Sequence, residues 1–184
     1  KFDQSIDSIF HCLGKNNQKC LVLGSGFGNK VKILSNVFDQ VYSIETMEEL
    51  LIFQNKRFVE AGITNVILLR SKIEKLPFIN DFFDLILIEE TFFDFIEVYS
   101  NKQKNSRVII LDEIKRILNQ KGCLCFGIEN NSKFNFLLKN NRIKNRKDVN
   151  LKKISKLIKN RGFHSKIYWV LPSIEKPYFT SNIE

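Results

Sequence analysis

The chain has 184 residues, the size of one domain, and its hydrophobic (43%) and charged (27%) fractions are those of an ordinary globular protein. This composition excludes a disordered chain, a collagen-like chain and a coiled coil. Apolar runs as short as Leu85–Ile88 exclude a membrane-spanning helix, and no signal-peptide pattern is present. The four cysteines form neither a C-x-x-C motif nor a Cys/His cluster, which indicates a reduced, cytoplasmic protein without a metal site.

Charge is distributed unevenly within the formal net charge of +9. Residues 1–100 hold 10 basic and 14 acidic residues (net −4), whereas residues 101–184 hold 19 and 6 (net +13). Residues 133–161 alone carry eleven Lys or Arg and one acid, Asp148. Such a segment can bind phosphate groups of a nucleic acid or of a phosphorylated acceptor. Few aromatic side chains interleave it for base stacking, so a solvated helix face is the simpler interpretation.

Hydrophobic periodicity predicts strands and helices in alternation along almost the whole chain. The predicted strands cover 20–23, 40–44, 65–69, 83–88, 123–128 and 163–170, with a weak seventh in the last dozen residues. The predicted helices cover 3–13, the residues after Gly28, 46–61, 106–118 and 148–162. Val31, Leu34 and Val37 lie on the inner face of the second of these. A Thr46–Glu49 capping box begins the third, Lys121-Gly122 ends the fourth, and Asp148 is the N-cap of the fifth.

This alternation predicts a single α/β domain with an open, mostly parallel sheet flanked by helices. The unbroken apolar run over 83–88 suits a parallel strand that is buried on both faces. Ligands of such sheets bind at the carboxyl ends of the strands. We therefore expect chemistry at the first strand–helix turn and at the ends of the second, fourth and fifth strands.

A glycine-rich turn, Gly24-Ser25-Gly26-Phe27-Gly28, joins the first predicted strand to a helix. Glycine allows positive φ and close approach of the backbone to a ligand, and the helix start offers unpaired amide groups. The spacing is G-x-G-x-G, and Asn29 stands where a nicotinamide or flavin fingerprint has its third glycine. A nicotinamide oxidoreductase is therefore a distant alternative, and no G-K-[ST] follows to make a P-loop.

Glu45 ends the second predicted strand, 17 residues after Gly28. An ionised carboxylate only accepts hydrogen bonds, so it can bind both hydroxyl groups of a ribose. The alternative role is that of an acid stabilised by the positive end of the next helix. The neighbouring glycine turn favours the ribose role.

Together these segments resemble the class I S-adenosyl-L-methionine (SAM)-dependent methyltransferases over roughly residues 18–170. Residues 20–28 are similar to the family's first motif, and Glu45 is similar to its ribose-binding acid. Residues 72–78 (KIEKLPF), 83–86 (FDLI) and 113–124 (EIKRILNQKGCL) resemble three later motifs, in the family's order and spacing.

The resemblance implies a Rossmann-like class I methyltransferase fold with SAM as cofactor. It divides the chain into an N-terminal helix (1–18), a cofactor-binding half (19–130) and an acceptor-side half (131–184). The glycines would cradle the methionine end of SAM, and Ile73 and Glu74 would border its adenine. The cofactor-binding residues that it implies are Gly24, Ser25, Gly26, Phe27, Gly28, Glu45, Thr46, Ile73, Glu74 and Glu89.

Two positions depart from the family pattern. Val22 stands where the first motif usually has an acid, and Lys72 stands where an acid usually lies near the adenine. A first residue other than Met is a third unusual feature. These features are compatible with a non-catalytic methyltransferase-like module of a larger assembly.

Carboxylates at the strand ends are the candidates for acid–base chemistry. A base that takes the proton of a hydroxyl acceptor would have to lie within reach of it, and Glu90 and Glu129 are the candidates for that role. Asn130 would position the acceptor. No N-P-P-Y tetrapeptide, the usual mark of amino-group methylation, follows the fourth strand.

The sequence therefore predicts a methyltransferase that acts on a small molecule or glycan precursor, with oxygen as the acceptor atom. Residues 127–130 (GIEN) and 168–172 (YWVLP) resemble a bacterial subgroup associated with surface glycans. The alternatives are an RNA methyltransferase that uses residues 133–161, and the non-catalytic module.

Overall fold

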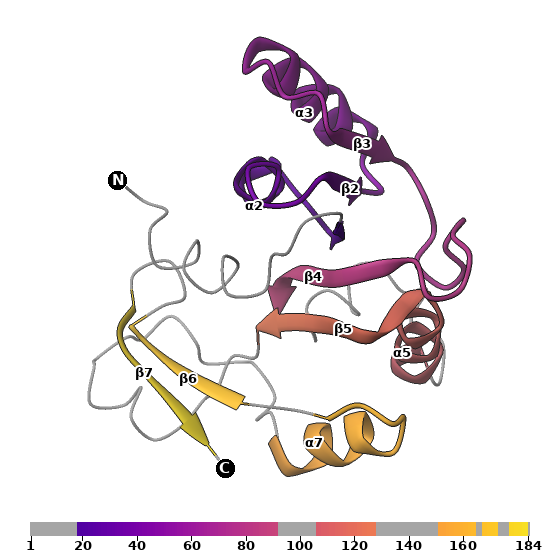
Figure 1. Cartoon of the computed structure of the whole chain (residues 1–184), viewed down its shortest axis with the longest axis vertical. Coiled ribbons are helices and arrows are strands. Elements are labelled where there is room, and N and C mark those ends of the chain that lie inside the picture. Colours follow the sequence, from indigo (N-terminus) through magenta and orange to yellow (C-terminus); the bar gives the residue numbers. More distant parts are fainter. Residues whose placement is uncertain (1–17, 92–105, 128–150, 165–166, 173–176, 184) are drawn as a thin grey trace.

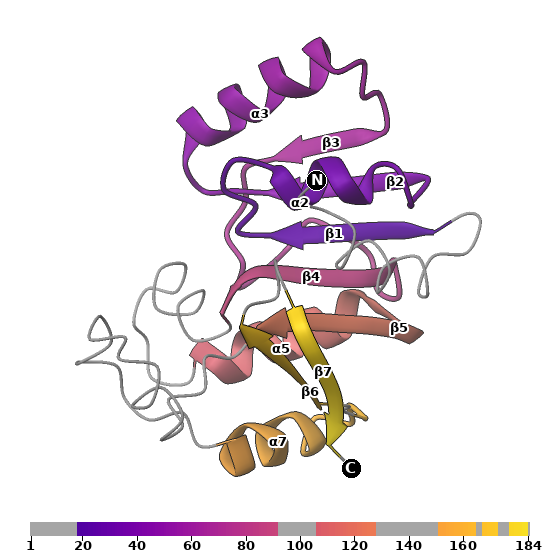
Figure 2. The same cartoon turned by 90° about the vertical axis from the view of Figure 1, so that its left-hand side faces the viewer.

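The computed structural model describes residues 18–91, 106–127, 151–164, 167–172 and 177–183. Its centre is a five-stranded sheet in the order β3-β2-β1-β4-β5, in which every neighbouring pair is parallel. Figure 2 shows these strands side by side. The strands are β1 (Lys19–Leu23), β2 (Gln40–Ile44), β3 (Val66–Leu69), β4 (Phe83–Thr91) and β5 (Leu118–Gly127); the helices are α2 (Asn29–Leu34), α3 (Glu48–Glu60), α5 (Ser106–Ile117) and α7 (Leu151–Lys159).

The strand order reverses beside β1. The chain proceeds outward from β1 through β2 to β3 and then returns to place β4 on the other side of β1. The order therefore reverses between β1 and β4, and in open α/β sheets ligands bind at the carboxyl ends of the strands beside such a reversal. The predicted fold class, an open parallel α/β sheet of the Rossmann-like type, is confirmed.

Two hydrophobic cores cover the two faces of the sheet, because successive side chains of a strand point to opposite faces. In β1, Leu21 and Leu23 pack in the core that contains α5, while Cys20 and Val22 pack in the core that contains α2 and α3. Figures 1 and 2 show α2 and α5 on opposite sides of the sheet. Val22, at the position where the family motif usually has an acid, is a fully buried packing residue.

The connection between α5 and β5 differs from the prediction. Lys121-Gly122 does not end a helix; β5 begins at Leu118, directly after α5, and contains Gly122. The pairing register jumps from Phe83–Leu118 to Leu85–Cys123, so β5 has extra residues relative to β4 at this point. The side-chain amide of Asn119 donates to Asp84 Oδ1 at 2.6 Å and fixes the irregular stretch to the sheet.

A separate two-stranded antiparallel sheet, β6 (Ile167–Pro172) with β7 (Pro177–Ile183), ends the chain. Both predicted C-terminal strands therefore exist, and they pair with each other rather than with β5. Both views place this hairpin and α7 on the β5 side of the sheet. The predicted helix over 3–13 and the N-cap at Asp148 lie outside the described residues. None of the described helices is long and apolar enough to cross a bilayer.

Candidate functional site

The turn after β1 requires its glycines. Gly24, Gly26 and Gly28 have φ values of +66°, +50° and +75°, in the left-handed region that glycine adopts at little cost. The Gly24 amide donates to Ile44 O at 3.0 Å, and the Gly28 amide donates to Ser25 O at 2.8 Å. The turn is thus tightly wound and bonded to the end of β2.

Gly26 and Gly28 differ in what surrounds them. A Cβ at Gly26 would meet no atom within 4 Å, so this glycine borders open space in which a ligand could lie. A Cβ at Gly28 would lie 2.8 Å from Phe58 Cζ and 2.9 Å from Gln54 Cγ. Gly28 therefore allows α3 to pack against the turn, whereas Gly26 leaves room beside it.

Glu45 follows β2 and is fully buried. Its Oε2 accepts a hydrogen bond from the Gly26 amide at 3.0 Å, and its Oε1 accepts from the amides of Thr46 (2.7 Å) and Met47 (3.3 Å). Carboxylate–amide bonds of this kind are among the stronger hydrogen bonds in proteins. The two marks that the sequence singled out, the glycine turn and Glu45, are therefore in direct contact.

The predicted capping box at Thr46 is wrong. Helix α3 begins at Glu48, its N-cap is Met47, and no side chain caps it. The Thr46 hydroxyl instead lies 3.3 Å from Glu45 Oε1, to which it donates. The carboxylate of the preceding residue is the stronger acceptor and takes the local donors.

Three buried polar residues, Gln54, Ser25 and Ser43, form a closed hydrogen-bonded ring next to the glycine turn, on the side that faces α3. This ring was not predicted from the sequence. Gln54 of α3, Ser25 of the turn and Ser43 of β2 are all fully buried. The Gln54 amide donates to Ser25 Oγ at 2.9 Å and to Gly26 O at 2.7 Å, and Ser43 donates to Gln54 Oε1 at 2.9 Å. The sequence feature that could have indicated this ring is the position of Gln54, four residues before Phe58 on the inward face of an amphipathic helix.

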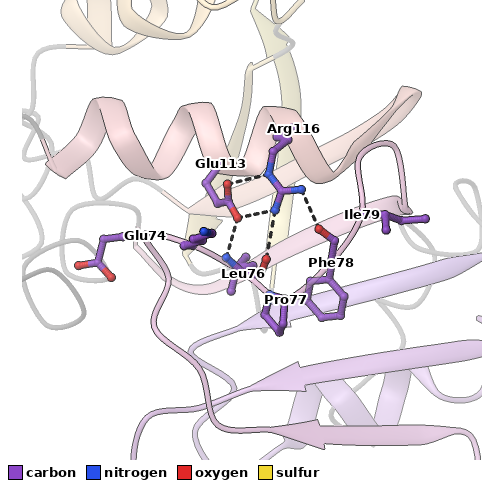
Figure 3. A pocket seen from close by; sticks show the side chains of 8 residues that line it. Glu74, Leu76, Pro77, Phe78, Ile79, Glu113 and Arg116 are labelled. Atoms are coloured by element: carbon purple, nitrogen blue, oxygen red, sulfur yellow. Dashed lines mark hydrogen bonds and ion pairs between the residues drawn. The ribbon is translucent and has the colours of Figure 1, made fainter.

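Ile73 and Glu74, predicted beside the adenine, have different environments. Ile73 is 1% exposed and belongs to the core that also contains Leu23 and Ile44. Glu74 borders a groove of about 610 Å³ between the β3–β4 connection and α5 (Figure 3). The residues that line this groove include neither the glycine turn nor Glu45.

Two of the sequence motifs meet at this groove. Arg116 of α5 donates to Leu76 O at 3.1 Å and to Phe78 O at 2.7 Å, and it forms an ion pair with Glu113 at 2.6 Å (Figure 3). The Leu76 amide donates to Glu113 Oε1. The hydrogen bond from Arg116 holds the pKa of Glu113 below its usual value. This network fixes the β3–β4 connection to α5.

The expected catalytic edge is only partly described. Glu89 and Glu90 lie near the end of β4, where the register passes from Ile88–Phe126 to Thr91–Gly127. Two residues of β4 therefore have no partner position on β5, as in a β-bulge. Strict alternation does not hold there. Glu129 and Asn130 lie outside the described residues.

The described cysteines offer no nucleophile. Burial raises the pKa of Cys125 to about 11 and that of Cys20 well above its usual value, so both thiols stay protonated at neutral pH. Both pack in the core with α2 and α3. Within the described part of the chain, no three His, Cys, Asp or Glu side chains gather as metal ligands.

Residues 21–126 match the family model of the methyltransferase domain, which covers more than half of the chain. The chain belongs to the methyltransferase domain family. It is a SAM-dependent methyltransferase, and its cofactor is S-adenosyl-L-methionine. No curated protein sequence matches this methyltransferase significantly.

Solved structures share the fold of this methyltransferase at low sequence identity. The YcgJ protein from Bacillus subtilis superimposes with a TM-score of 0.66 at 18% identity, covering 91% of this chain and 70% of that one. A SAM-dependent methyltransferase from Aquifex aeolicus has a TM-score of 0.64 at 19% identity, covering 91% and 81%. Haemonchus contortus phosphoethanolamine N-methyltransferase 1, in complex with phosphoethanolamine and S-adenosylhomocysteine (SAH), has a TM-score of 0.54 at 16% identity, covering 65% and 24%.

Proposed function

We propose that this methyltransferase transfers a methyl group to a hydroxyl oxygen of a small molecule or glycan precursor. The main support for the proposed cofactor site is the contact between Gly26 and Glu45 at the carboxyl ends of β1 and β2. The open space beside Gly26 leaves room for a ligand that lies flat on the turn. The residues present therefore fit a nucleoside cofactor.

Each part of the turn has a role in this assignment. Gly24, Gly26 and Gly28, with Ser25 and Phe27, would cradle the methionine end, and Glu45, with Thr46, would bind the ribose. Glu45 is fully buried and already accepts three backbone amides, so ribose binding requires it to become accessible and to share its oxygens. Glu74 and Glu89 would lie at the border of the cofactor site.

Ile73 would not contact the adenine directly. Its side chain is buried in the core, so it would support the adenine side of the site from below. Lys72, beside it, is exposed and is a donor where the family usually has an acceptor.

Carboxylates at the end of β4 support oxygen as the acceptor atom. SAM supplies an activated methyl group, and the protein has to orient the acceptor and remove its proton. We assign the base to Glu90, with Glu129 as the second candidate. The place of Glu90 at the carboxyl end of β4, the edge where ligands of such sheets bind, supports this assignment.

Two observations favour a small acceptor. Phosphoethanolamine, bound in the Haemonchus contortus structure, shows that a protein of this fold takes a small phosphorylated molecule. The resemblance of residues 127–130 and 168–172 to the glycan-associated subgroup favours a sugar. The basic segment 133–161 would complement a phosphate or pyrophosphate group on such an acceptor.

The test is methyl transfer from radiolabelled SAM to a panel of nucleotide sugars, each paired with its deoxy analogue. The proposal predicts a product methylated on oxygen, no product from the analogue that lacks the accepting hydroxyl, and at least a hundredfold loss of rate in Glu90→Gln. Glu60→Gln, at an exposed position at the end of α3, is the control and should keep the wild-type rate. Methylation on nitrogen would contradict the proposal.

RNA is the alternative acceptor. Lys156 and Lys159 of α7 are exposed, whereas Arg161 forms an ion pair with Asp112 at 3.0 Å. Methyl transfer to RNA, with an affinity that falls steeply as salt rises, would favour this alternative over a small acceptor.

A further inference from the structure

Gln54 is an unexpected residue at a fully buried position. It and Phe58 are the buried residues of α3. A buried amide destabilises the fold unless its hydrogen bonds are all made, and here they are directed at the glycine turn and β2. An apolar residue would pack at this position without that requirement, so the amide calls for a specific explanation.

The bonds of Gln54 have one self-consistent arrangement. Gly26 O can only accept, so the nitrogen of the amide must face it, and Oε1 must then accept from Ser43. Ser43 has a single hydroxyl proton, which this bond uses. The 2.7 Å contact between the two serine hydroxyls is therefore made by the Ser25 proton. Every donor in the ring then has an acceptor, and turning the amide over would place Oε1 against Gly26 O and lose that bond.

Gly26 is consequently held at both of its backbone polar groups. Its amide donates to Glu45 Oε2 at 3.0 Å, and its carbonyl accepts from Gln54 at 2.7 Å. Glu45 fixes the peptide plane that precedes Gly26, and Gln54 fixes the plane that follows it. These are the planes that border the open space beside Gly26.

Other residues of the same face of α3 also contact the turn. Arg57 donates to Phe27 O at 2.9 Å, the Phe53 ring lies edge-on to Phe27 at 5.5 Å, and Phe58 lies against Gly28. Residues 53, 54, 57 and 58 share one side of a helix. Helix α3 therefore packs against the turn, and Gln54 is the fully buried residue of α3 that makes polar contact with the turn.

We propose that Gln54 is a positioning residue for cofactor binding, which acts on the cofactor through the Ser25–Gly26–Phe27 backbone and does not touch it. The inference rests on the proposed placement of SAM against the glycine turn. A turn already held in its binding conformation loses less entropy when the ligand binds, so the ring should raise affinity for SAM and SAH alike.

Asn65 provides a matched control. Its side-chain amide also donates to two backbone carbonyls, those of Ser35 at 2.8 Å and Phe38 at 3.0 Å, but these lie in the α2–β2 connection, away from the turn. Gln54→Met and Asn65→Leu each replace the amide by an apolar group on a side chain of similar length. Gln54→Met removes the three hydrogen bonds of Gln54, and Asn65→Leu removes the two of Asn65. Both variants should be less stable than the wild type.

The experiment is calorimetric titration with SAH at a temperature where urea unfolding shows both variants to be fully folded. We expect Gln54→Met to bind SAH at least tenfold more weakly and Asn65→Leu to bind within twofold of the wild type. The amide resonance of Gly26 in a nitrogen–proton spectrum should shift in Gln54→Met and stay in place in Asn65→Leu. A Gln54→Met variant with wild-type affinity, or equal weakening in both variants, would overturn the inference.

Gly26→Ala separates this inference from the proposed cofactor site. If Gly26→Ala weakens SAH binding and Gln54→Met does not, the site stands and the role of Gln54 is overturned. If the wild type binds no SAH, both are overturned. If Gln54→Met fails to fold, Ser43→Ala takes its place, because Ser43→Ala removes the hydroxyl that donates to Gln54 Oε1. We then expect SAH to bind Ser43→Ala at least threefold more weakly than the wild type. Unchanged affinity would overturn the inference.

Discussion

The Gly26 amide donates a hydrogen bond to Glu45 Oε2 at 3.0 Å, although the two residues are 19 positions apart. Oε1 of the same carboxylate accepts from the amides of Thr46 and Met47. Both oxygens of Glu45 therefore face N–H donors, and the carboxylate connects the end of β1 to the start of α3. Glu45 supports the local structure of the site as well as being the proposed ribose ligand.

Glu45→Gln should destabilise the fold. In either orientation its side-chain NH₂ faces a backbone N–H, which leaves at least one buried donor without an acceptor and costs about 1–3 kcal/mol. Urea unfolding measures this loss. Glu60→Gln, which changes an exposed charge, should shift the unfolding free energy by no more than about 0.5 kcal/mol. Equal stability of Glu45→Gln and wild type would show that these amide bonds are not maintained in solution.

Gly28→Ala should cost more stability than Gly62→Ala. Both glycines have positive φ, +75° and +66°, so both variants incur a left-handed strain of about 1–2 kcal/mol. A Cβ at Gly62 meets no atom within 4 Å, whereas one at Gly28 collides with Phe58 and Gln54, which adds about 1–3 kcal/mol of overpacking. The midpoints of denaturant unfolding compare the two. Indistinguishable losses would mean that α3 does not pack closely on the turn.

Most of the fold could be predicted from the sequence because it depends on local patterns. The apolar run over 83–88 and the glycines at 62 and 162 mark the strand and the helix ends where the structure has them. The proximity of the glycine turn and Glu45 followed from the rule that ligands bind at the carboxyl ends of parallel strands.

The errors arise where tertiary contacts override local patterns. Thr46 has the pattern of a capping residue, but the Glu45 carboxylate beside it is a better acceptor for the local donors. Lys121-Gly122 has the pattern of a helix end, but the pairing of Leu118 with Phe83 brings this stretch into β5. Gln54 is polar, and only the folded chain shows that its hydrogen-bond partners are buried with it.

The Glu113–Arg116 pair should make stability depend on pH. Arg116 lowers the pKa of Glu113 in the folded state below its ordinary value of 4.5. The ionised carboxylate therefore contributes stability that is complete above the ordinary pKa and is lost as the pH falls through the lowered one. The difference in unfolding free energy between wild type and Glu113→Gln should be constant near neutral pH and shrink below about pH 4.5. A difference that is independent of pH would contradict the ion pair.

The central claim is that the cofactor binds against the glycine turn at Gly26, and calorimetric titration with SAH tests it most directly. Gly26→Ala and Gly62→Ala carry the same kind of backbone strain, with φ values of +50° and +66° and open space at both positions. Only the methyl group at position 26 would occupy the proposed cofactor site. We predict micromolar binding to the wild type and to Gly62→Ala, and at least tenfold weaker binding to Gly26→Ala. Wild-type affinity in Gly26→Ala, or no binding to the wild type up to millimolar SAH, would contradict the claim.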